Sequence, residues 1–195
     1  MKIASIVEGH GEVAALPVLL RRLAEWRLPQ DYPDVQVPIR IRRDRFLNRD
    51  DEFRRYLHLA AAKCGDQGWI LMLLDADDDC PATRGEEILQ RARACVPNRA
   101  VSVVLANREY EAWFIAAAES LDGYRGLAIK PEDASDPETR RDAKGWIKAR
   151  MPGGSYGETT DQPAFTAHMD LGEAFARSRS FRKLCSEWDR RNAGE

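Results

Sequence analysis

The sequence has few of the residues that build zinc sites, disulfides or side-chain nucleophiles. It contains only three histidines and four cysteines. The cysteines are widely spaced, with no Cys-x-x-Cys pair and no histidine at a zinc-ligand spacing, so we interpret them as reduced thiols. His10 is the only histidine near the acidic residues that follow the first predicted strand. A Ser-His-Asp or Cys-His catalytic arrangement therefore has little support.

A charge imbalance, a long apolar run and a nucleotide-binding loop are also missing. The 30 Lys+Arg and 32 Asp+Glu residues nearly cancel, so any site for a polyanion must be local. The first apolar run reaches Glu8 too soon for a signal peptide or a membrane span, and we expect a cytoplasmic protein with no membrane association. Neither the Gly-x-x-x-x-Gly-Lys nor the Gly-x-Gly-x-x-Gly pattern occurs.

Apolar segments alternate with amphipathic segments along residues 1–120. Runs of apolar or alternating residues predict strands, and apolar spacings of three and four residues predict helices, with Pro17 near a first helical turn. The strands are predicted at 2–7, 35–41, 69–74 and 100–106, and the helices at 13–26, 50–64, 81–94 and 109–120. This order predicts an α/β fold with a Rossmann-like core of about four mostly parallel strands flanked by helices.

The character of each segment places it within this fold. The continuous apolar run of residues 69–74 is typical of a central strand buried on both faces, whereas Pro38 indicates an edge strand. Residues 121–160 are rich in proline and glycine, with one helix predicted at 142–150, and residues 162–191 read as helical. We therefore predict an α/β core at 1–120 and a C-terminal extension at 121–195 whose helices cap the core.

Acidic residues follow three of the predicted strands, where parallel sheets bind their ligands. They are Glu8 after the first strand, Asp75, Asp77 and Asp79 after the third, and Glu109 and Glu111 after the fourth. Crowded carboxylates repel each other unless a cation neutralises them, and oxygen ligands suit Mg²⁺ or Mn²⁺. If the chain stays extended past the third strand, Asp75 and Asp77 point the same way and can share one metal ion.

Each of these acidic residues also has a structural interpretation. A lone Asp-x-Asp is more often a solvated turn that caps the next helix, but Glu8 at the matching strand end favours a metal site. Glu109 and Glu111 are predicted to open a helix, where acidic residues are favourable in any case. Positive residues after the second strand could bind nucleic-acid phosphates or form a solvated face. These residues are Arg40, Arg42, Arg43 and Arg45.

These motifs together resemble the Toprim domain that topoisomerases, primases and OLD-type nucleases share. The resemblance rests on Glu8 in Glu-Gly-His-Gly-Glu and on Asp75-Ala-Asp two strands later. The chain more closely resembles the bacterial Toprim-like family DUF4276, which shows Glu-Gly-x-x-Glu, an Asp-rich strand end, Glu-x-Glu-Ala-Trp and a late Asp-Gln. Here these motifs lie at residues 8–12, 75–79, 109–113 and 161–162, with Ser180-Phe181 in the last helix.

The resemblance implies a Toprim core with a general acid or base at Glu8 and Mg²⁺ held by Asp75 and Asp77, with Glu109 or Glu111 as a further ligand. It implies a metal-dependent nuclease acting on DNA or RNA, in a bacterial defence or mobile-element system, beside an ABC- or SMC-like ATPase partner. Two alternatives stay open. One is a non-catalytic Toprim-like module that pairs with such an ATPase, and the other is a phosphohydrolase for small nucleotides.

Overall fold

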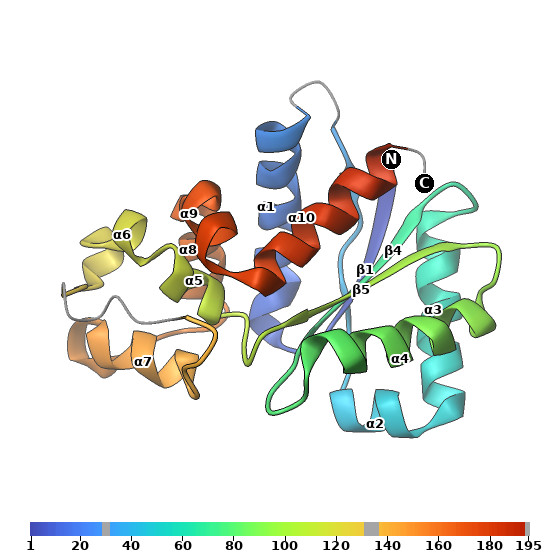
Figure 1. Ribbon diagram of the computed structural model, residues 1–195, viewed down its shortest axis with the longest axis horizontal. Helices are drawn as coiled ribbons and strands as arrows, with labels where there is room; N and C mark the ends of the chain where they lie inside the picture. Colours follow the sequence, from blue (N-terminus) through green and yellow to red (C-terminus); the bar gives the residue numbers. More distant parts are fainter. Residues whose placement is uncertain (29–31, 131–136, 194–195) are drawn as a thin grey trace.

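A parallel β-sheet forms the middle layer of the protein (Figure 1). The computed structural model describes residues 1–28, 32–130 and 137–193, and within them the sheet has five strands. They are β1 (Lys2–Val7), β2 (Asp34–Val35), β3 (Ile39–Arg40), β4 (Trp69–Asp75) and β5 (Ala100–Ala106). Their order is β2-β1-β4-β5, with β3 also beside β1, and every pair is parallel. The predicted α/β fold is confirmed, and β4 lies inside the sheet as its apolar run indicated.

Helices cover both faces of the sheet (Figure 1). One face packs against α1 (His10–Arg27) and α10 (Arg179–Asn192), and the other against α2 (Arg43–Asn48), α3 (Asp50–Cys64) and α4 (Pro81–Cys95). Along β4, Leu71 and Leu73 enter the first core, while Ile70 and Met72 enter the second. Because both faces of the sheet are buried, side chains pointing to either face are apolar. Burial of each such side chain contributes roughly 1.5–3 kcal/mol to the free energy of folding.

The predicted second strand is an edge strand, but it is interrupted. Gln36 N donates to Ile3 O and Ile41 N donates to Val7 O, each at 2.9 Å, so chain segments on both sides of Pro38 follow β1. Pro38 has no N–H to donate, and the strand divides there into β2 and β3. The edge position is thus correct, whereas the continuous strand predicted at 35–41 is wrong.

A group of short helices lies beyond the carboxyl ends of the strands (Figure 1). It comprises α5 (Ala112–Ala116), α6 (Ala118–Leu121), η1 (Tyr124–Gly126), α7 (Ala143–Arg150), η3 (Pro152–Gly154), α8 (Asp161–His168) and α9 (Leu171–Arg177). In this group α8 packs along α1, where Arg22 Nη1 donates to the carbonyl oxygens of Thr166 and Met169 at 2.7 Å each. These helices and the sheet share one hydrophobic core.

Several helix boundaries differ from the predictions. The helix predicted at 109–120 begins only at Ala112 and breaks at Ala117, and the helical stretch predicted at 162–191 divides into three helices. Asp170 and Ser178 cap the second and third of these by accepting from Glu173 N and Phe181 N. Such caps compete with a continuous helix because they satisfy the free N–H groups of a new first turn.

The start of the first helix and the place of Pro17 also differ from the predictions. Helix α1 begins at His10 rather than Val13, so Pro17 lies inside it and not in its first turn. Gly9 is the N-cap, and the Glu12 carboxylate accepts from its N–H. Helix α2 was not predicted, since its six residues are too few to establish a helical period.

Buried polar bridges fix α10 to the rest of the fold. Ser102 on β5 accepts from Trp69 Nε1 at 3.0 Å and donates to Glu187 Oε2 at 2.5 Å, which joins β4, β5 and α10. By contrast, Ser5 on β1 is equally buried, but its Oγ has no hydrogen-bond partner in the described part of the chain. These two serines therefore differ in what the hydroxyl group contributes to stability.

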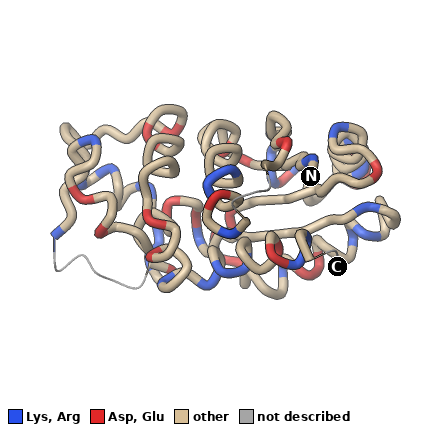
Figure 2. Tube along the Cα trace, turned by 90° about the horizontal axis from the view of Figure 1, so that it is seen from above, with Lys and Arg blue, Asp and Glu red and all other residues tan. Residues whose placement is uncertain are grey.

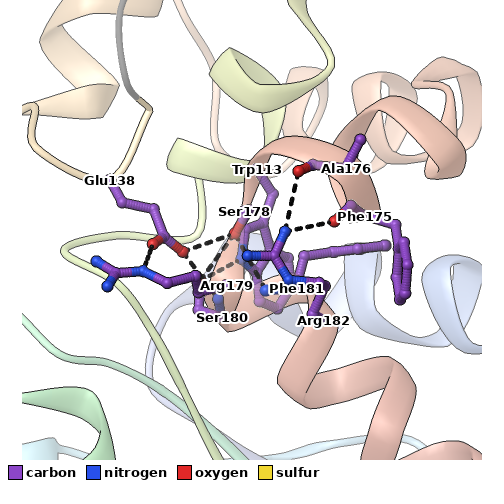
Figure 3. A network of polar contacts seen from close by, with 9 residues as sticks. All are labelled: Trp113, Glu138, Phe175, Ala176, Ser178, Arg179, Ser180, Phe181 and Arg182. Carbon is purple, nitrogen blue, oxygen red and sulfur yellow. Dashed lines mark hydrogen bonds and ion pairs between the residues drawn. The ribbon is translucent and has the colours of Figure 1, made fainter.

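A second network fixes the beginning of α10 (Figure 3). The buried carboxylate of Glu138 accepts from Ser178 Oγ at 2.9 Å and from Ser180 N at 2.8 Å, and Ser180 Oγ accepts from Trp113 Nε1 at 2.9 Å. Burial acts to raise the pKa of Glu138, but hydrogen bonds from Ser180, Arg179 and Ser178 outweigh it and lower that pKa. Trp113 and Ser180, which both belong to the DUF4276-like motifs, thus link α5 to the beginning of α10.

No helix among the described residues is long and apolar enough to cross a membrane. Basic and acidic residues are interspersed along the chain (Figure 2). The near-neutral net charge therefore reflects local mixing rather than two large regions of opposite sign, and a charged site must be identified from particular side chains.

Candidate functional site

The carboxyl ends of β1 and β4 bring Glu8 and Asp75 to the same edge of the sheet. Val7 pairs with Leu73, so the residue after β1 lies beside the last residues of β4. Asp75 in turn pairs with Ala106 of β5, which precedes the loop to Glu109 and Glu111. The register of the parallel sheet therefore gathers three acidic strand ends.

Asp75 is the centre of a group of four carboxylates that we name the inner carboxylate cluster: Glu8, Glu12, Asp75 and Glu111. Burial raises the pKa of Asp75 well above its ordinary value, and Glu12, Glu111 and Glu8 raise it further, in that order. A hydrogen bond from Tyr110 N to Asp75 Oδ1, at 2.9 Å, acts in the opposite direction without cancelling the rise. The cluster thus carries more negative charge than its surroundings stabilise.

Glu111 is a buried member of the cluster, with 2% of its surface exposed. Burial raises its pKa to about 7, although Lys144 lowers it. Tyr156 Oη donates to Glu111 Oε1 at 3.1 Å, and Lys144 Nζ lies 3.0 Å from Glu158 Oε1. Glu111, Glu158 and Asp75 all raise the pKa of Lys144 and outweigh the effect of its burial. Lys144 is therefore a cation of this site.

Glu8 has an oxygen atom without a partner. Its Oε2 is buried and makes no hydrogen bond to any described residue. Burial raises the pKa of Glu8, with Asp77 and Glu12 adding to the rise and Arg43 opposing it. A buried carboxylate oxygen usually has a donor or a cation beside it. Glu8 is thus suited to bind a cation or to exchange a proton.

Glu12 enters the cluster through its position in the first turn of α1. One carboxylate oxygen accepts from Gly9 N, and Oε1 accepts from Gln162 Nε2 at 3.2 Å. The chain is closely packed here: a Cβ atom on Gly11 would lie 1.6 Å from Gln162 Oε1 and 2.8 Å from Glu158 O. Only glycine allows α8 and the preceding loop to approach the glutamates this closely.

The next three aspartates, Asp77, Asp78 and Asp79, form what we name the acidic turn, and its geometry differs from the prediction. Asp77 has a left-handed backbone with φ of 50°, so the chain does not stay extended beyond Asp75. The condition for Asp75 and Asp77 to point the same way is therefore not met. Asp75 lies in the inner cluster, whereas the side chain of Asp77 is 61% exposed.

Arginines neutralise the acidic turn. Arg43 donates to Asp77 Oδ2 at 3.0 Å and to Asp79 Oδ2 at 2.9 Å. Arg108 and Arg141 both approach Asp78 Oδ1, at 2.5 and 3.0 Å. Each carboxylate of the turn thus forms an ion pair, whereas in the described part of the chain none of the four carboxylates of the inner cluster does.

The other predicted site residues have different surroundings. Glu109 Oε2 accepts from Lys144 N at 2.8 Å and so holds the first turn of α7. Arg40, Arg42 and Arg45 line a cavity of about 200 Å³ beside the sheet edge, and Arg43 alone of the four reaches the acidic turn. Among the described residues, no three His, Cys, Asp or Glu side chains converge closely enough, as they stand, to hold a metal ion.

A cavity of about 410 Å³ lies outside this acidic region, between α4, β5 and the beginning of α10. It is lined partly by apolar residues, including Leu89, Val103 and Leu105, and one wall is the Glu138 network of Figure 3. None of the residues predicted from the sequence as site residues lines it. This cavity and the site residues predicted from the sequence therefore lie in different places.

A protein-family match covers the residues of the candidate site. The chain matches the family described as "Domain of unknown function (DUF4276)" over residues 7–188. It belongs to this family. The match to DUF4276 includes the whole inner carboxylate cluster, the acidic turn and the Glu138 network. No curated protein and no solved structure gives a significant match to the chain.

Several residues of the site were not predicted from the sequence. Glu12 appears in the sequence analysis only within the Glu-Gly-His-Gly-Glu motif, and Lys144, Tyr156 and Gln162 have no predicted role. Glu12 and Gln162 do belong to the DUF4276-like motifs Glu-Gly-x-x-Glu and Asp-Gln, which was the available signal. For Lys144 and Tyr156 the sequence held no comparable signal, because each reaches Glu111 from a loop-rich region far along the chain.

Proposed function

We propose that this chain is a Mg²⁺-dependent nuclease of the Toprim type, with the inner carboxylate cluster as its metal-binding centre. The observation that carries the proposal is the imbalance of charge at adjacent strand ends. Four carboxylates lie near one another there, the pKa values of Glu8, Asp75 and Glu111 are raised, and Arg43 and Lys144 only partly offset the negative charge. A divalent cation would remove this repulsion.

The oxygen atoms present suit such an ion chemically, and binding it would draw the carboxylates closer together than they stand in the described part of the chain. Glu8 Oε2 is buried and lacks a hydrogen-bond partner among the described residues, and Asp75 keeps one oxygen beyond the one that accepts from Tyr110 N. Oxygen donors of this kind are those that Mg²⁺ and Mn²⁺ prefer. We assign Asp75 and Glu8 as ligands, with Glu111 or Glu12 completing the set. Asp77 and Asp79 would join only by leaving Arg43.

Each residue of the site would have its own role in phosphodiester hydrolysis. A bound Mg²⁺ supplies charge stabilisation at the phosphate and acidifies a water molecule. Glu8 is suited to move a proton between water and the departing oxygen, since burial raises its pKa in the metal-free protein. Tyr156 holds Glu111 in place by a hydrogen bond, and Lys144 attracts the Glu111 carboxylate electrostatically. The resemblance to Toprim nucleases supports the same roles for Glu8 and Asp75.

The test is cleavage by the purified chain. Plasmid DNA, linear duplex, single-stranded DNA and tRNA are incubated with Mg²⁺, Mn²⁺ or EDTA. We compare wild type with Asp75→Asn, which keeps the shape of the side chain, and with Asp51→Asn, an exposed aspartate in the first turn of α3. We expect metal-dependent cleavage that Asp75→Asn abolishes and Asp51→Asn preserves.

Other outcomes would direct the assignment elsewhere. Cleavage that persists in EDTA, or in Asp75→Asn, would overturn the metal-nuclease proposal. Turnover of free nucleotides without cleavage of any polymer would identify a small-nucleotide phosphohydrolase. Isothermal titration with Mn²⁺ provides an independent measurement, since binding that Asp75→Asn removes tests the metal site without requiring activity.

A further inference from the structure

An arginine-rich cavity lies at the edge of the sheet formed by β3. Its volume is about 200 Å³, and residues from β3, α2 and α3 line it. We name it the arginine pocket; its polar walls are Arg40, Arg42, Arg45, Glu52, Arg55 and Tyr56. Four guanidinium groups thus surround a cavity that contains one carboxylate.

The single carboxylate does not balance this charge. Glu52 forms an ion pair with Arg45 and lies 4.0 Å from Arg49 Nη1, so its charge is already shared by two arginines. Arg40, Arg42 and Arg55 have no carboxylate partner among the described residues. The guanidinium of Arg55 instead stacks on the Tyr56 ring, 4.6 Å from its centre. Several unpaired guanidinium groups around one cavity favour a bound anion, above all one that accepts several hydrogen bonds.

The arginine pocket borders the candidate site. Arg40 pairs with Val7, the residue before Glu8, and Ile41 N donates to Val7 O. Arg43 then reaches the acidic turn, while Arg42 and Arg45, three positions apart at the beginning of α2, face the pocket. The segment of residues 40–45 therefore contacts both the acidic turn and the pocket. Arg43 binds the turn, whereas Arg40, Arg42 and Arg45 line the pocket.

We propose that the arginine pocket binds a terminal phosphate monoester of a nucleic-acid strand and so positions that strand beside the inner carboxylate cluster. This inference rests on the proposed nuclease function. A small concave pocket suits a chain end, because a phosphate within a chain needs an open groove through which the strand can enter and leave. A monoester also carries up to two negative charges and three terminal oxygens, which matches three guanidinium groups without partners.

The test measures binding without cleavage. Short single-stranded oligonucleotides with an internal fluorophore carry a 5′-phosphate, a 3′-phosphate or no terminal phosphate, and fluorescence anisotropy is recorded in EDTA. We expect one phosphorylated end to bind at least about tenfold more tightly than the unphosphorylated strand, the gain of one or more charge-assisted hydrogen bonds. Equal affinities for all three strands would overturn the proposal.

Variants locate the binding on the protein. Arg42→Gln and Arg55→Gln should each remove most of the preference for the phosphorylated end, whereas Arg54→Gln should keep it, since Arg54 is exposed on α3 and does not line the pocket. Thermal unfolding verifies that each variant is folded. If Arg55→Gln does not fold, Arg55→Lys, which keeps the positive charge, replaces it in the comparison. A preference that survives in both glutamine variants would place the phosphate elsewhere and refute the pocket.

The source of the phosphate and the enzymatic function are tested separately. Inorganic phosphate and a mononucleotide are added as competitors, and a mononucleotide that bound as tightly as the oligonucleotide would overturn the nucleic-acid end as ligand. If the nuclease proposal alone fails, the preference in EDTA remains and is unchanged in Asp75→Asn, while no polymer is cut. If the pocket alone fails, metal-dependent cleavage remains and is the same for phosphorylated and unphosphorylated strands.

Discussion

Raising the pH should destabilise the metal-free protein through Glu111. The pKa of this carboxyl is about 7 in the folded protein, against an ordinary value of 4.5. The folded state therefore holds the proton more tightly than the unfolded state does. The stability that neutral Glu111 provides is complete below about pH 4.5 and is lost as the pH rises through about 7.

The size of the effect follows from the difference between the two pKa values. Each pH unit corresponds to about 1.4 kcal/mol, so full ionisation of Glu111 costs about 3 kcal/mol. About 2 kcal/mol of this falls between pH 5.5 and pH 8. In Glu111→Gln the side chain is neutral at every pH and can still accept from Tyr156 Oη. We expect wild type to lose about 2 kcal/mol more than this variant over that interval.

The measurement is urea unfolding in EDTA at pH 5.5 and pH 8, followed by tryptophan fluorescence. Glu119→Gln is the matched control, because Glu119 is exposed on the neighbouring helix α6 and should leave the pH dependence unchanged. Adding Mg²⁺ at pH 8 should stabilise wild type more than Glu111→Gln. If wild type and Glu111→Gln lose the same free energy between the two pH values, the assignment of a raised pKa to Glu111 is refuted.

Two pairs of substitutions test the packing around the site. Gly11→Ala should lower the free energy of unfolding by about 1–3 kcal/mol, since its Cβ would overlap Gln162, whereas Gly85→Ala has space and should be neutral or stabilising. Urea unfolding compares them, and a neutral Gly11→Ala would show that α8 can move away. Ser102→Ala should cost about 1–3 kcal/mol by leaving the buried Trp69 Nε1 without an acceptor and removing one of the donors to Glu187 Oε2, which keeps Arg190, while Ser5→Ala should cost little. Equal losses for the two serines in thermal unfolding would contradict this difference.

The sequence contained most of the information about the layers of the fold. An apolar run such as residues 69–74 can be stabilised only where both faces are covered, so it predicted the interior strand β4 correctly. Pro38 predicted the sheet edge for an equally local reason, the missing N–H. Helix ends were predicted less well, since caps such as Ser178 depend on which N–H groups the tertiary structure leaves free.

The sequence also indicated which strand ends carry acidic residues. It determined the positions of Glu8 and Asp75 because each directly follows an apolar strand, and parallel strands place such residues at one edge of the sheet. The sequence did not show whether Asp77 or Glu12 is the neighbour of Asp75. That choice depends on a left-handed backbone at Asp77 and on the Gly9 cap that turns Glu12 inward.

Only the tertiary structure decided the charges around these carboxylates. Arg43 neutralises the acidic turn, while Lys144 and Tyr156 reach Glu111 from a distant part of the chain. A side chain's pKa depends on its burial and on the charges within a few ångströms, and neither is fixed by residues adjacent in the sequence. The sequence thus determined which strand ends carry carboxylates, and the packing of distant loops and helices decided which of these carboxylates form ion pairs.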